Sequence, residues 1–413
     1  MKSTTVVILG GGIGGIVAAN KLREQLATNH PVILVERNEY HAFSPSFLWL
    51  VTGDRRPSQI QRPLGSLLRR GVELVHAGVT SIDLGSRRVQ TGTGEIRYDY
   101  LIVALGADLA WDAIPGLDET IHTFYSFEGS QKLAKALQAF SDGTIAIVVA
   151  AAPYKCPGAP HEAAMLIADC FRKRALSSKV KIQLFTPEPE PMPVAGPQLG
   201  EAVRSMLESK GVSFHPLCKL ARIDPGGREL IFDNRESTHY DLLIAIPPHR
   251  APTVVVEAGL TGPTGWIPVE PQTLATGHTG VYAIGDVTSI PIPGRWKPDV
   301  PLSLPKAGVF AHAQAEVVAR RISSEINGRS AEASFCGDGY CMLEAGEDLA
   351  GFAFGNFFAQ PAPDVQLRQI GRTWHVGKVL FEKWWLSPPG VRRTLTAWAL
   401  KAGARLYGIP ISL

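Results

Sequence analysis

The sequence has few cysteines, little net charge and no long apolar run, and each shortage excludes a class of protein. Five cysteines in 413 residues, none in a CxxC or Cys/His spacing, make neither a disulfide scaffold nor a zinc site. A formal net charge of +3 is too small to favour nucleic acid as the partner of the whole chain. No stretch of about 18 uninterrupted apolar residues predicts a transmembrane helix, and the N-terminal residues show no secretory signal. With 45% hydrophobic and 19% charged residues, the chain is instead a globular protein of two or three domains.

A glycine-rich turn near the N-terminus is the first positive feature. Gly10, Gly12 and Gly15 have the GxGxxG spacing, between a strand predicted over residues 5–9 and a helix predicted over 16–26. Glycines at such a turn let backbone amides at a helix N-terminus approach a pyrophosphate. The pattern predicts a dinucleotide-binding, Rossmann-like βαβ unit rather than an ordinary glycine turn.

Two acidic residues far apart in the chain indicate which dinucleotide is bound. Glu36 ends the second predicted strand and can accept hydrogen bonds from ribose hydroxyls. Asp286 follows a strand that ends in Gly285, and this element is similar to the one that two-dinucleotide flavoproteins place against the ribityl chain. Gly106 ends another such strand. FAD is therefore the predicted cofactor.

A second strand-helix-strand cycle over residues 144–185 lacks the fingerprint glycines. Pro153 and Tyr154 stand where the backbone would have to approach a phosphate, so the turn disfavours binding of a nicotinamide cofactor. Cys156 follows them, beside Lys155 and at the start of a predicted helix. These electropositive surroundings are expected to lower the pKa of the thiol and favour the thiolate. A cysteine that is merely buried at a helix start is the alternative.

Further motifs distinguish the chain from other oxidoreductases with a glycine fingerprint. Cys156 lies in CPGAPHE, Cys341 in YCMLEAG, Lys378 in KVLFEKW, and Lys306 and Gly308 in LPKAG. Together with the fingerprint and the Gly-Asp element, these motifs make most of the chain resemble the sulfide:quinone oxidoreductases. The relatives of that family are flavocytochrome c sulfide dehydrogenases and type II NADH dehydrogenases. The resemblance implies an α/β fold with two Rossmann-like domains.

The resemblance also implies a mechanism. In that family two cysteines form a redox-active disulfide or sulfur bridge over the flavin, and the matching positions are Cys156 and Cys341. Sulfide would attack the bridge and leave a persulfide on one sulfur, while the freed thiolate, assigned to Cys341, passes two electrons to the flavin. Glu162 would manage protons, unless it is only a carboxylate on a helix face. Lys306 would stabilise the negative charge of the reduced flavin.

The predicted binding residues form two sets. The cofactor-binding set is Gly10, Gly12, Gly15, Glu36, Val79, Gly106, Gly285, Asp286 and Lys306. The quinone-binding set, implied by the resemblance, is Gly308, Lys378 and Phe381.

Three cysteines fall outside this site. Cys170 and Cys218 are expected to be buried packing residues, and Cys336 is expected to be a bystander near the second redox cysteine. Many members of the resembled family carry a third cysteine before the second cycle, and residues 123–130 hold none.

The C-terminal residues combine aromatic rings with positive charge. From residue 372 to 413, seven Lys or Arg stand against one acidic residue. One side of an ideal helix in this segment would carry Val391, Leu395, Trp398, Ala402 and Leu406. Aromatic rings, cations and an apolar stripe favour monotopic binding to a membrane surface, on an undetermined face. A helix docked on the core or on a second copy is the alternative.

The predicted domain boundaries follow these motifs. Residues 1–110 and 251–326 are assigned to an FAD-binding domain, 111–250 to a second Rossmann-like domain with Cys156, and 327–413 to a C-terminal region with Cys341, the quinone site and the membrane-binding tail. A long helix is predicted over 304–326.

The predicted function is that of a membrane-associated FAD enzyme that oxidises sulfide to polysulfide or sulfur and reduces quinone. The expected partners are sulfide, quinone and a bilayer surface, and a homo-oligomer is left open. The alternatives are a flavocytochrome c-type sulfide dehydrogenase, a type II NADH:quinone oxidoreductase and a non-catalytic flavoprotein. The missing second fingerprint opposes the NADH enzyme, and the basic aromatic tail and absent export signal oppose the cytochrome-linked one.

Overall fold

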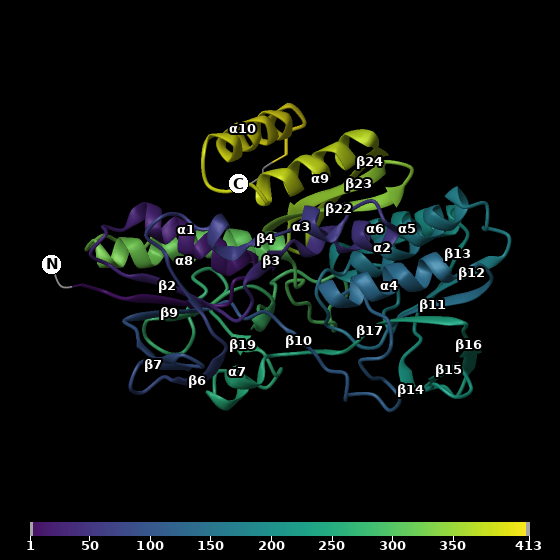
Figure 1. Cartoon of the computed structure of the whole chain (residues 1–413), viewed down its shortest axis with the longest axis horizontal. Coiled ribbons are helices and arrows are strands. Elements are labelled where there is room, and N and C mark those ends of the chain that lie inside the picture. Colours follow the sequence, from purple (N-terminus) through teal and green to yellow (C-terminus); the bar gives the residue numbers. More distant parts are fainter. Residues whose placement is uncertain (1–2, 410–413) are drawn as a thin grey trace.

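The computed structural model describes residues 3–409, which contain two larger parallel sheets side by side and an antiparallel C-terminal sheet. In Figure 1 the first parallel sheet lies on the left, the second on the right, and the C-terminal elements lie across the top. The site described below depends on these three sheets and on the helices that follow their strands.

The first parallel sheet joins an early and a late part of the chain. Its strand order is β20-β9-β1-β2-β5. The strands are β1 (Val6–Leu9), β2 (Val32–Glu36), β5 (Glu73–His76), β9 (Tyr100–Val103) and β20 (Val281–Ala283). Helices α1 (Ile13–Gln25) and α8 (Gly308–Ile326) pack against each other on this sheet. Because β20 pairs with β9, the glycine turn after β1 and the Gly-Asp turn after β20 lie at the same edge.

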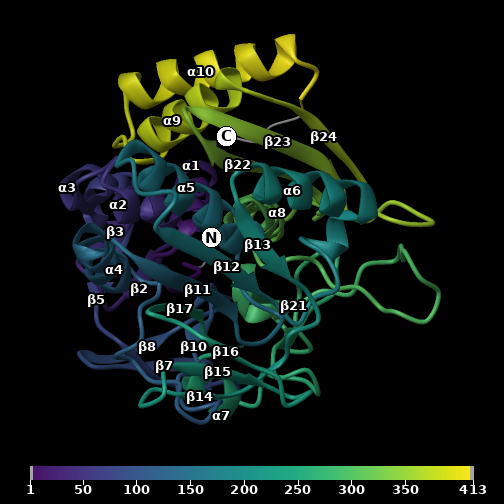
Figure 2. The ribbon, with the colours of Figure 1, turned by 90° about the vertical axis from the view of Figure 1, so that its right-hand side faces the viewer.

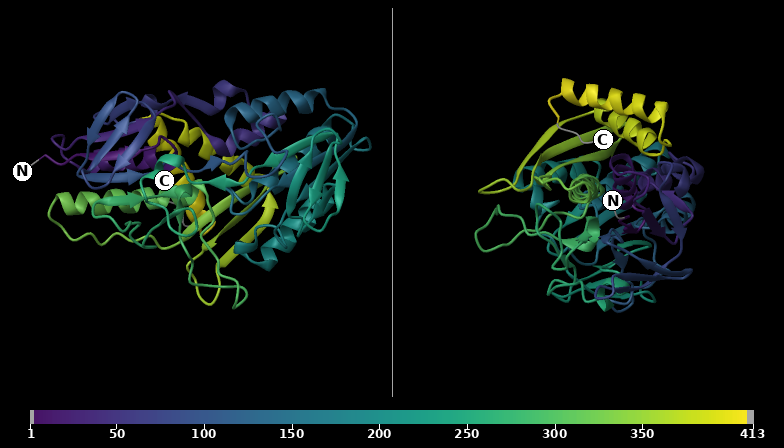
Figure 3. Two further views of the ribbon diagram at one scale, coloured as in Figure 1. Left: turned by 90° about the horizontal axis from the view of Figure 1, so that it is seen from below. Right: turned by 90° about the vertical axis from the view of Figure 1, so that its left-hand side faces the viewer.

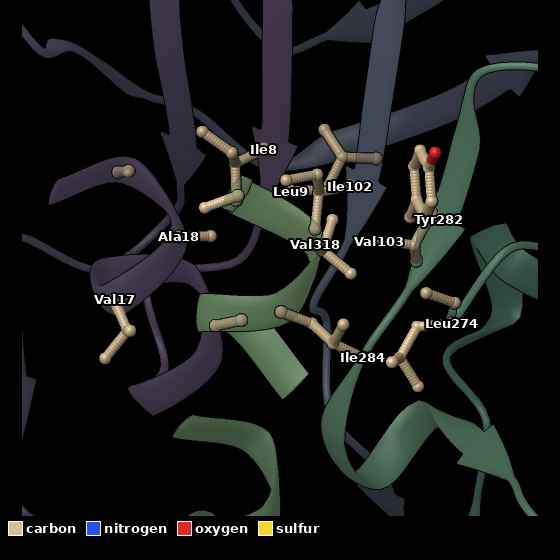
Figure 4. Packing of buried hydrophobic residues seen from close by; sticks show 14 of the residues in the cluster. Ile8, Leu9, Val17, Ala18, Ile102, Val103, Leu274, Tyr282, Ile284 and Val318 are labelled. Carbon is tan, nitrogen blue, oxygen red and sulfur yellow. The ribbon is translucent and has the colours of Figure 1, made fainter. Parts of the chain in front are cut away.

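The core of this half consists of β-branched and leucine side chains from the central strands. Ile8, Leu9, Ile102 and Val103 are fully buried and meet Val318 of α8 (Figure 4). Parallel strands covered on both faces have continuous apolar runs, which is the pattern that these segments show. Each such side chain stabilises the fold by roughly 1.5–3 kcal/mol relative to leaving it exposed.

The second parallel sheet repeats this architecture. Its strand order is β13-β12-β11-β17. The strands are β11 (Gly143–Val149), β12 (Val180–Phe185), β13 (Val212–His215) and β17 (Leu242–Ile246), and the helices are α4 (Phe127–Ala139), α5 (Ala159–Lys173) and α6 (Pro197–Ser209). The segment between β11 and α5 carries Cys156.

Two small antiparallel sheets and several short elements complete these halves. The sheets are β6 (Val79–Asp83) with β7 (Arg88–Thr91) and β8 (Gly94–Arg97), and β14 (Leu220–Asp224) with β15 (Glu229–Phe232) and β16 (Ser237–His239). The paired short strands are β3 (Tyr40–Ala42) with β4 (Gln61–Pro63), β10 (Asp108–Leu109) with β18 (His249–Arg250), and β19 (Ile267–Pro268) with β21 (Thr288–Ser289). The short helices are α2 (Phe47–Thr52), α3 (Pro57–Ile60) and α7 (Thr253–Glu257).

The C-terminal region is an antiparallel sheet followed by two helices. The sheet contains β22 (Asp338–Gly346), β23 (Leu349–Asn356) and β24 (Asp364–Gly371), and the helices are α9 (Arg372–Trp385) and α10 (Val391–Leu406). Figures 2 and 3 show α10 as the outermost layer, with α9 between it and the rest of the molecule. Among the helices of residues 3–409, none has the length and apolar character needed to cross a bilayer.

The predicted fold class is confirmed, since two Rossmann-like parallel sheets are present. One predicted helix boundary is wrong, because α8 begins at Gly308 and not at residue 304. The four residues before it run as an extended segment in which Lys306 forms a parallel bridge with Lys155. This bridge ties the second half of the molecule to the first at the site.

Candidate functional site

A cavity of about 1170 Å³ is lined by residues of both parallel halves and of the C-terminal region. Most of the predicted site residues line it. These are Gly12, Gly106, Cys156, Glu162, Gly285, Asp286, Lys306, Gly308, Cys341, Lys378 and Phe381. The fold therefore brings together residues that the sequence places in seven separate segments.

The glycine turn contributes one open position to the cavity and two close-packed ones. A Cβ on Gly15 would lie 1.8 Å from the carbonyl oxygen of Gly10, and a Cβ on Gly10 would lie 2.4 Å from that of Ala104. These two glycines allow the close packing of helix and strands. Gly12, at the start of α1, lines the cavity and would have nothing within 4 Å of a Cβ.

Two predicted cofactor residues, Glu36 and Val79, do not line the cavity. The carboxylate of Glu36 accepts hydrogen bonds from the backbone amides of Gly11 at 2.6 Å and Asn38 at 2.8 Å, so it holds the glycine turn. Val79 begins β6 and pairs with Thr91.

Asp286 provides the test of whether the residues fit FAD. It follows β20 in a short 3-10 turn, is half-buried and lines the cavity, and its buried Oδ1 atom has no hydrogen-bond partner among the described residues. Burial raises the pKa of Asp286, while Lys155 and Lys306 act in the opposite direction. A buried acceptor without a donor costs about 1–3 kcal/mol, so this oxygen fits a ligand that brings hydroxyl donors. Because Gly12 and Asp286 line the same cavity, the open backbone at Gly12 fits the pyrophosphate of FAD and the Asp286 oxygen fits its ribityl chain.

The ammonium group of Lys306 is fixed at the cavity wall. Its Nζ donates to the backbone carbonyls of Asp286 at 2.7 Å and Thr288 at 2.9 Å, and lies 3.4 Å from the centre of the Trp266 ring. Burial lowers its pKa to about 8, so the group still carries a positive charge at neutral pH.

Cys156, from the second parallel half, and Cys341, from the C-terminal region, line the same cavity. Cys156 has a left-handed φ of 53°, and its amide donates to the carbonyl of Lys306 at 2.6 Å. The Sγ of Cys341, on β22, lies 3.5 Å from the position of a Cβ on Gly158. Both cysteines are free and line the cavity.

The prediction that the pKa of Cys156 is lowered is wrong for this pair of free thiols. Burial raises the pKa of Cys156, and the negative charges of Cys341 and Glu162 raise it further. The sequence neighbour Lys155 does not counteract this, because its charge interacts with Asp286 and Asp108. The thiol faces the cavity rather than bulk water, so its exposed surface provides little solvation. Burial also raises the pKa of Cys341, to about 11.

Glu162 and Lys378 form a buried ion pair beside the cysteines. Each side chain is 7% exposed. Burial raises the pKa of Glu162 to about 7, although Lys378 acts in the opposite direction. Burial would lower the pKa of Lys378, but the neighbouring carboxylates of Glu162 and Glu344 hold it above its usual value. Glu162 is thus a buried cavity residue and not a solvated carboxylate on a helix face.

Aromatic rings lie around Phe381, the side chain of α9 that lines the cavity. Phe381 lies 6.0 Å from Phe43, 6.3 Å from Tyr340 and 5.3 Å from Trp384, measured between ring centres. Gly308, Lys378 and Phe381, the predicted quinone residues, all line the cavity.

The sequence analysis missed several residues of the site. Glu344 is buried near Glu162, and Trp49 places its ring 5.1 Å from Lys378 Nζ. The only available signal for Glu344 was its place in the motif of Cys341, and Trp49 gave none. Of the other cysteines, Cys336 lines the cavity, and Cys170 and Cys218 are half-buried rather than buried.

The apolar stripe of α10 faces away from the protein. Val391, Leu395, Trp398 and Leu406 are 77%, 63%, 72% and 82% exposed. On the opposite side, Ala397 and Leu400 pack against the core. The alternative of a stripe docked on the core is therefore wrong.

Comparisons with known proteins agree with this architecture. The family model described as pyridine nucleotide-disulphide oxidoreductase matches residues 4–315. The mitochondrial sulfide:quinone oxidoreductase of Mus musculus is 30% identical over 299 residues, 69% of this chain and 66% of the mouse protein. The sulfide-quinone reductase of Aquifex aeolicus is 27% identical over 394 residues, 92% of this chain and 90% of that one.

A solved structure and a second group of relatives extend the comparison. The crystal structure of the Aquifex aeolicus sulfide:quinone oxidoreductase has a TM-score of 0.83 and 25% identity, and covers 97% of this chain and 92% of that one. A type II NADH:quinone oxidoreductase of Staphylococcus haemolyticus is 24% identical over 340 residues, 79% of this chain and 83% of that protein. The chain therefore belongs to the pyridine nucleotide-disulphide oxidoreductase family and is an FAD-dependent oxidoreductase.

Proposed function

We propose that this protein oxidises sulfide to polysulfide or sulfur at the Cys156–Cys341 pair and reduces a membrane quinone. The two cysteines are far apart in the sequence, yet they line one cavity with Asp286 of the cofactor end and Phe381 of α9, and this observation carries the proposal. When bound, FAD accepts two electrons and returns them to a second substrate. The similarity to the mouse and Aquifex enzymes supports the same conclusion.

The cysteine pair performs the sulfur chemistry in its oxidised, bridged form. Sulfide forms a new S–S bond to one cysteine as the Cys156–Cys341 bond breaks, which leaves a persulfide and a thiolate. We assign the thiolate to Cys341, because its pKa is raised less than that of Cys156. A thiol of lower pKa is the better leaving group in this exchange.

Glu162 holds the proton that the reaction moves. With a pKa raised to about 7, the carboxyl group is poised between its two protonation states near neutral pH. Lys378 is its ion-pair partner and lines the cavity beside the aromatic rings. The positive charge of Lys306, which also lines the cavity, stabilises negative charge that develops there.

The exposed stripe of α10 is proposed to lie in a bilayer surface. Four large apolar side chains project outward, and the exposed Arg392, Lys401 and Arg405 are placed to meet lipid phosphates. Burial of each side chain contributes ~2 kcal/mol. Helix α10 packs on α9, which carries Phe381 and Lys378, so a quinone leaving the bilayer reaches the cavity from this side.

Vesicle flotation tests the membrane contact. The Trp398→Ser and Leu395→Ser variants should each lower partitioning onto anionic vesicles by roughly tenfold, because each removes one exposed apolar side chain that the bilayer would bury. A matched exposed substitution on the same helix, Thr394→Ser, should have no effect. Equal partitioning of the three variants would contradict a lipid contact through this stripe.

Anaerobic flavin absorbance of the holoenzyme tests the reaction. Sulfide should bleach the flavin, and a soluble quinone should restore its absorbance. Bleaching by NADH and not by sulfide would favour a type II NADH:quinone oxidoreductase, and reoxidation by cytochrome c and not by quinone would favour the flavocytochrome c-type enzyme.

The second turn opposes the NADH reaction. Glu188, which follows β12 where a ribose-binding acid would be expected, accepts hydrogen bonds from Tyr154 at 2.7 Å and from Thr186 at 3.2 Å. The backbone amide of Cys156 donates to the carbonyl of Lys306, so this amide is not free to bind a phosphate.

A further inference from the structure

A row of polar side chains leads from the cavity toward the protein surface, between α9 and β22. His375 lies one helical turn before Lys378, so the two side chains lie on the same face of α9. His375 Nδ1 is 2.8 Å from Glu344 Oε2, and His375 Nε2 is 3.8 Å from Asp348 Oδ1. The side chain of Glu344 is 2% exposed and that of Asp348 is 74% exposed. The row thus begins in water and runs inward.

The inner end of the row reaches the buried ion pair. The backbone amide of Glu344 donates to the carboxylate of Glu162, which also pairs with Lys378. Glu344 Oε1 is buried and has no hydrogen-bond partner among the described residues. One oxygen of the Glu344 carboxylate contacts the imidazole of His375, and the other is unpartnered near the Glu162–Lys378 pair. Glu344 is therefore placed to accept a proton from His375 and to pass it to the ion pair.

Trp49 covers one side of the row. Its ring centre is 5.9 Å from the ring of His375 and 5.1 Å from Lys378 Nζ. The nearby guanidinium of Arg55 also lies over this ring, but it is paired with Glu382 at 3.0 Å. The charged groups that face the row are Glu162, Lys378 and the paired Arg55 at its inner end, and Lys173 of α5, which interacts with Asp348 and pairs with Asp169, at its outer end. The indole excludes water from this side, so the side chains themselves are the path inward.

We propose that Asp348, His375 and Glu344 relay protons from solvent to the Glu162–Lys378 pair, which supplies them to the quinone. This inference rests on the proposed reduction of quinone. A quinone takes up two electrons and two protons to become a quinol, and oxidation of HS⁻ to sulfur releases two electrons and one proton. One further proton per turnover must therefore come from water. An imidazole can accept it on one ring nitrogen while it donates from the other.

Reoxidation of the chemically reduced holoenzyme isolates this step. The protein is reduced anaerobically with dithionite and mixed with a soluble quinone, while flavin absorbance and the proton uptake reported by an indicator dye are followed. His375→Ala should slow both signals roughly tenfold or more, and added imidazole should restore them. Bleaching of the oxidised enzyme by sulfide should keep its wild-type rate.

The matched control is His239→Ala. His239 is an exposed histidine of β16 that lies 3.6 Å from Asp241, outside the cavity lining, so its loss should change neither signal and imidazole should have no effect. Thermal unfolding midpoints establish that each variant is folded. If His375→Ala does not fold, the variant Asp348→Asn, at the exposed end of the row, is tested in its place. We expect it to slow flavin reoxidation and proton uptake less than His375→Ala, and the slowing should increase as the pH rises.

Three results decide the question. Wild-type reoxidation and proton uptake in the folded variant, or slowing that imidazole does not reverse, would overturn the relay. Failure of sulfide to bleach the wild-type flavin, with normal reoxidation by quinone, would overturn the sulfide reaction and leave the relay standing. Failure of quinone to reoxidise the wild-type protein would overturn both.

Discussion

The two parallel halves of the molecule share an architecture but differ in the turn that follows the first strand of each. After β1 the turn is built from glycines, and the first turn of α1 holds no acidic residue. After β11 the turn contains Tyr154 and Cys156, and the first turn of α5 holds Glu162. The first helix N-terminus is thus suited to an anionic phosphate, and the second carries a thiol and a carboxyl group. The same strand-turn-helix framework can bind a cofactor or perform chemistry, depending on the side chains of the turn.

Removal of the thiol from the second turn should have the largest effect. We expect Cys156→Ser to lower sulfide-dependent flavin reduction by about a thousandfold or more, because a hydroxyl cannot form the S–S bond that sulfide attacks. Stopped-flow flavin absorbance measures this rate. Cys170→Ser, on the helix α5 that follows Cys156 but outside the cavity lining, should react like the wild type. Sulfide-dependent flavin reduction at the wild-type rate in Cys156→Ser would contradict a chemical role for the second turn.

Alanine substitutions should then show which of the two turns is packed more tightly, through the loss of folding stability that each substitution causes. Gly15→Ala places a Cβ 1.8 Å from a backbone oxygen and should destabilise the protein by roughly 1–3 kcal/mol or more. At Gly158 the nearest atom to a Cβ is Leu343 Cδ1 at 3.1 Å, a side chain that can shift, so Gly158→Ala should cost well under half as much. Chemical denaturation of both variants compares them, and equal losses would mean that the glycine turn is not the tighter one.

Glu162, in the first turn of α5, should make the rate of quinone reduction depend on pH. The first turn of α1 has no acidic residue that could do so. Since burial raises the pKa of Glu162 to about 7, the carboxyl group is protonated below that pH and loses its proton above it. The rate of flavin reoxidation by quinone should therefore be level below about pH 7 and fall above it, by up to about tenfold per unit. Glu162→Gln should be slower and lack this inflection, and an unchanged inflection would assign it to another group.

The same shift affects folding stability in a defined direction. Because the pKa of Glu162 is higher in the folded protein than its ordinary value of 4.5, its contribution to stability is complete below that pH and is lost as the pH rises through about 7.

The smallest effect concerns the open glycine of the first turn. Gly12→Ala meets no protein atom within 4 Å, so the unfolding midpoint of the apoprotein should not change. The new methyl group faces the cavity, and we expect it to weaken FAD binding by roughly tenfold, as measured by flavin fluorescence during titration. Unchanged affinity would place the cofactor elsewhere in the cavity.

Much of the fold could be predicted from the sequence because its signals are local. The runs that became β1, β2, β11 and β12 are apolar and β-branched, and the glycine spacing after β1 has one structural use. The start of α8 was predicted four residues too early, because an apolar pattern cannot reveal that Lys306 pairs with Lys155. The outward stripe of α10 followed from helical periodicity alone, and its exposure is confirmed.

The chemistry of the site depends on distances that no local pattern contains. Motifs in the sequence indicated Cys156, Glu162 and Cys341, but only the tertiary structure shows that they share a cavity. Lys155 was expected to lower the pKa of the neighbouring thiol, yet the turn directs its charge toward Asp286, and burial raises the pKa instead.

The sequence by itself determined the secondary structure, the cofactor class and which side chains can react, because these follow from residue type and spacing along the chain. The tertiary structure decided which groups are buried together and how their charges act on one another. Desolvation and Coulomb interactions depend on distances through space, and residues such as Glu162 and Lys378 become neighbours only when the chain has folded.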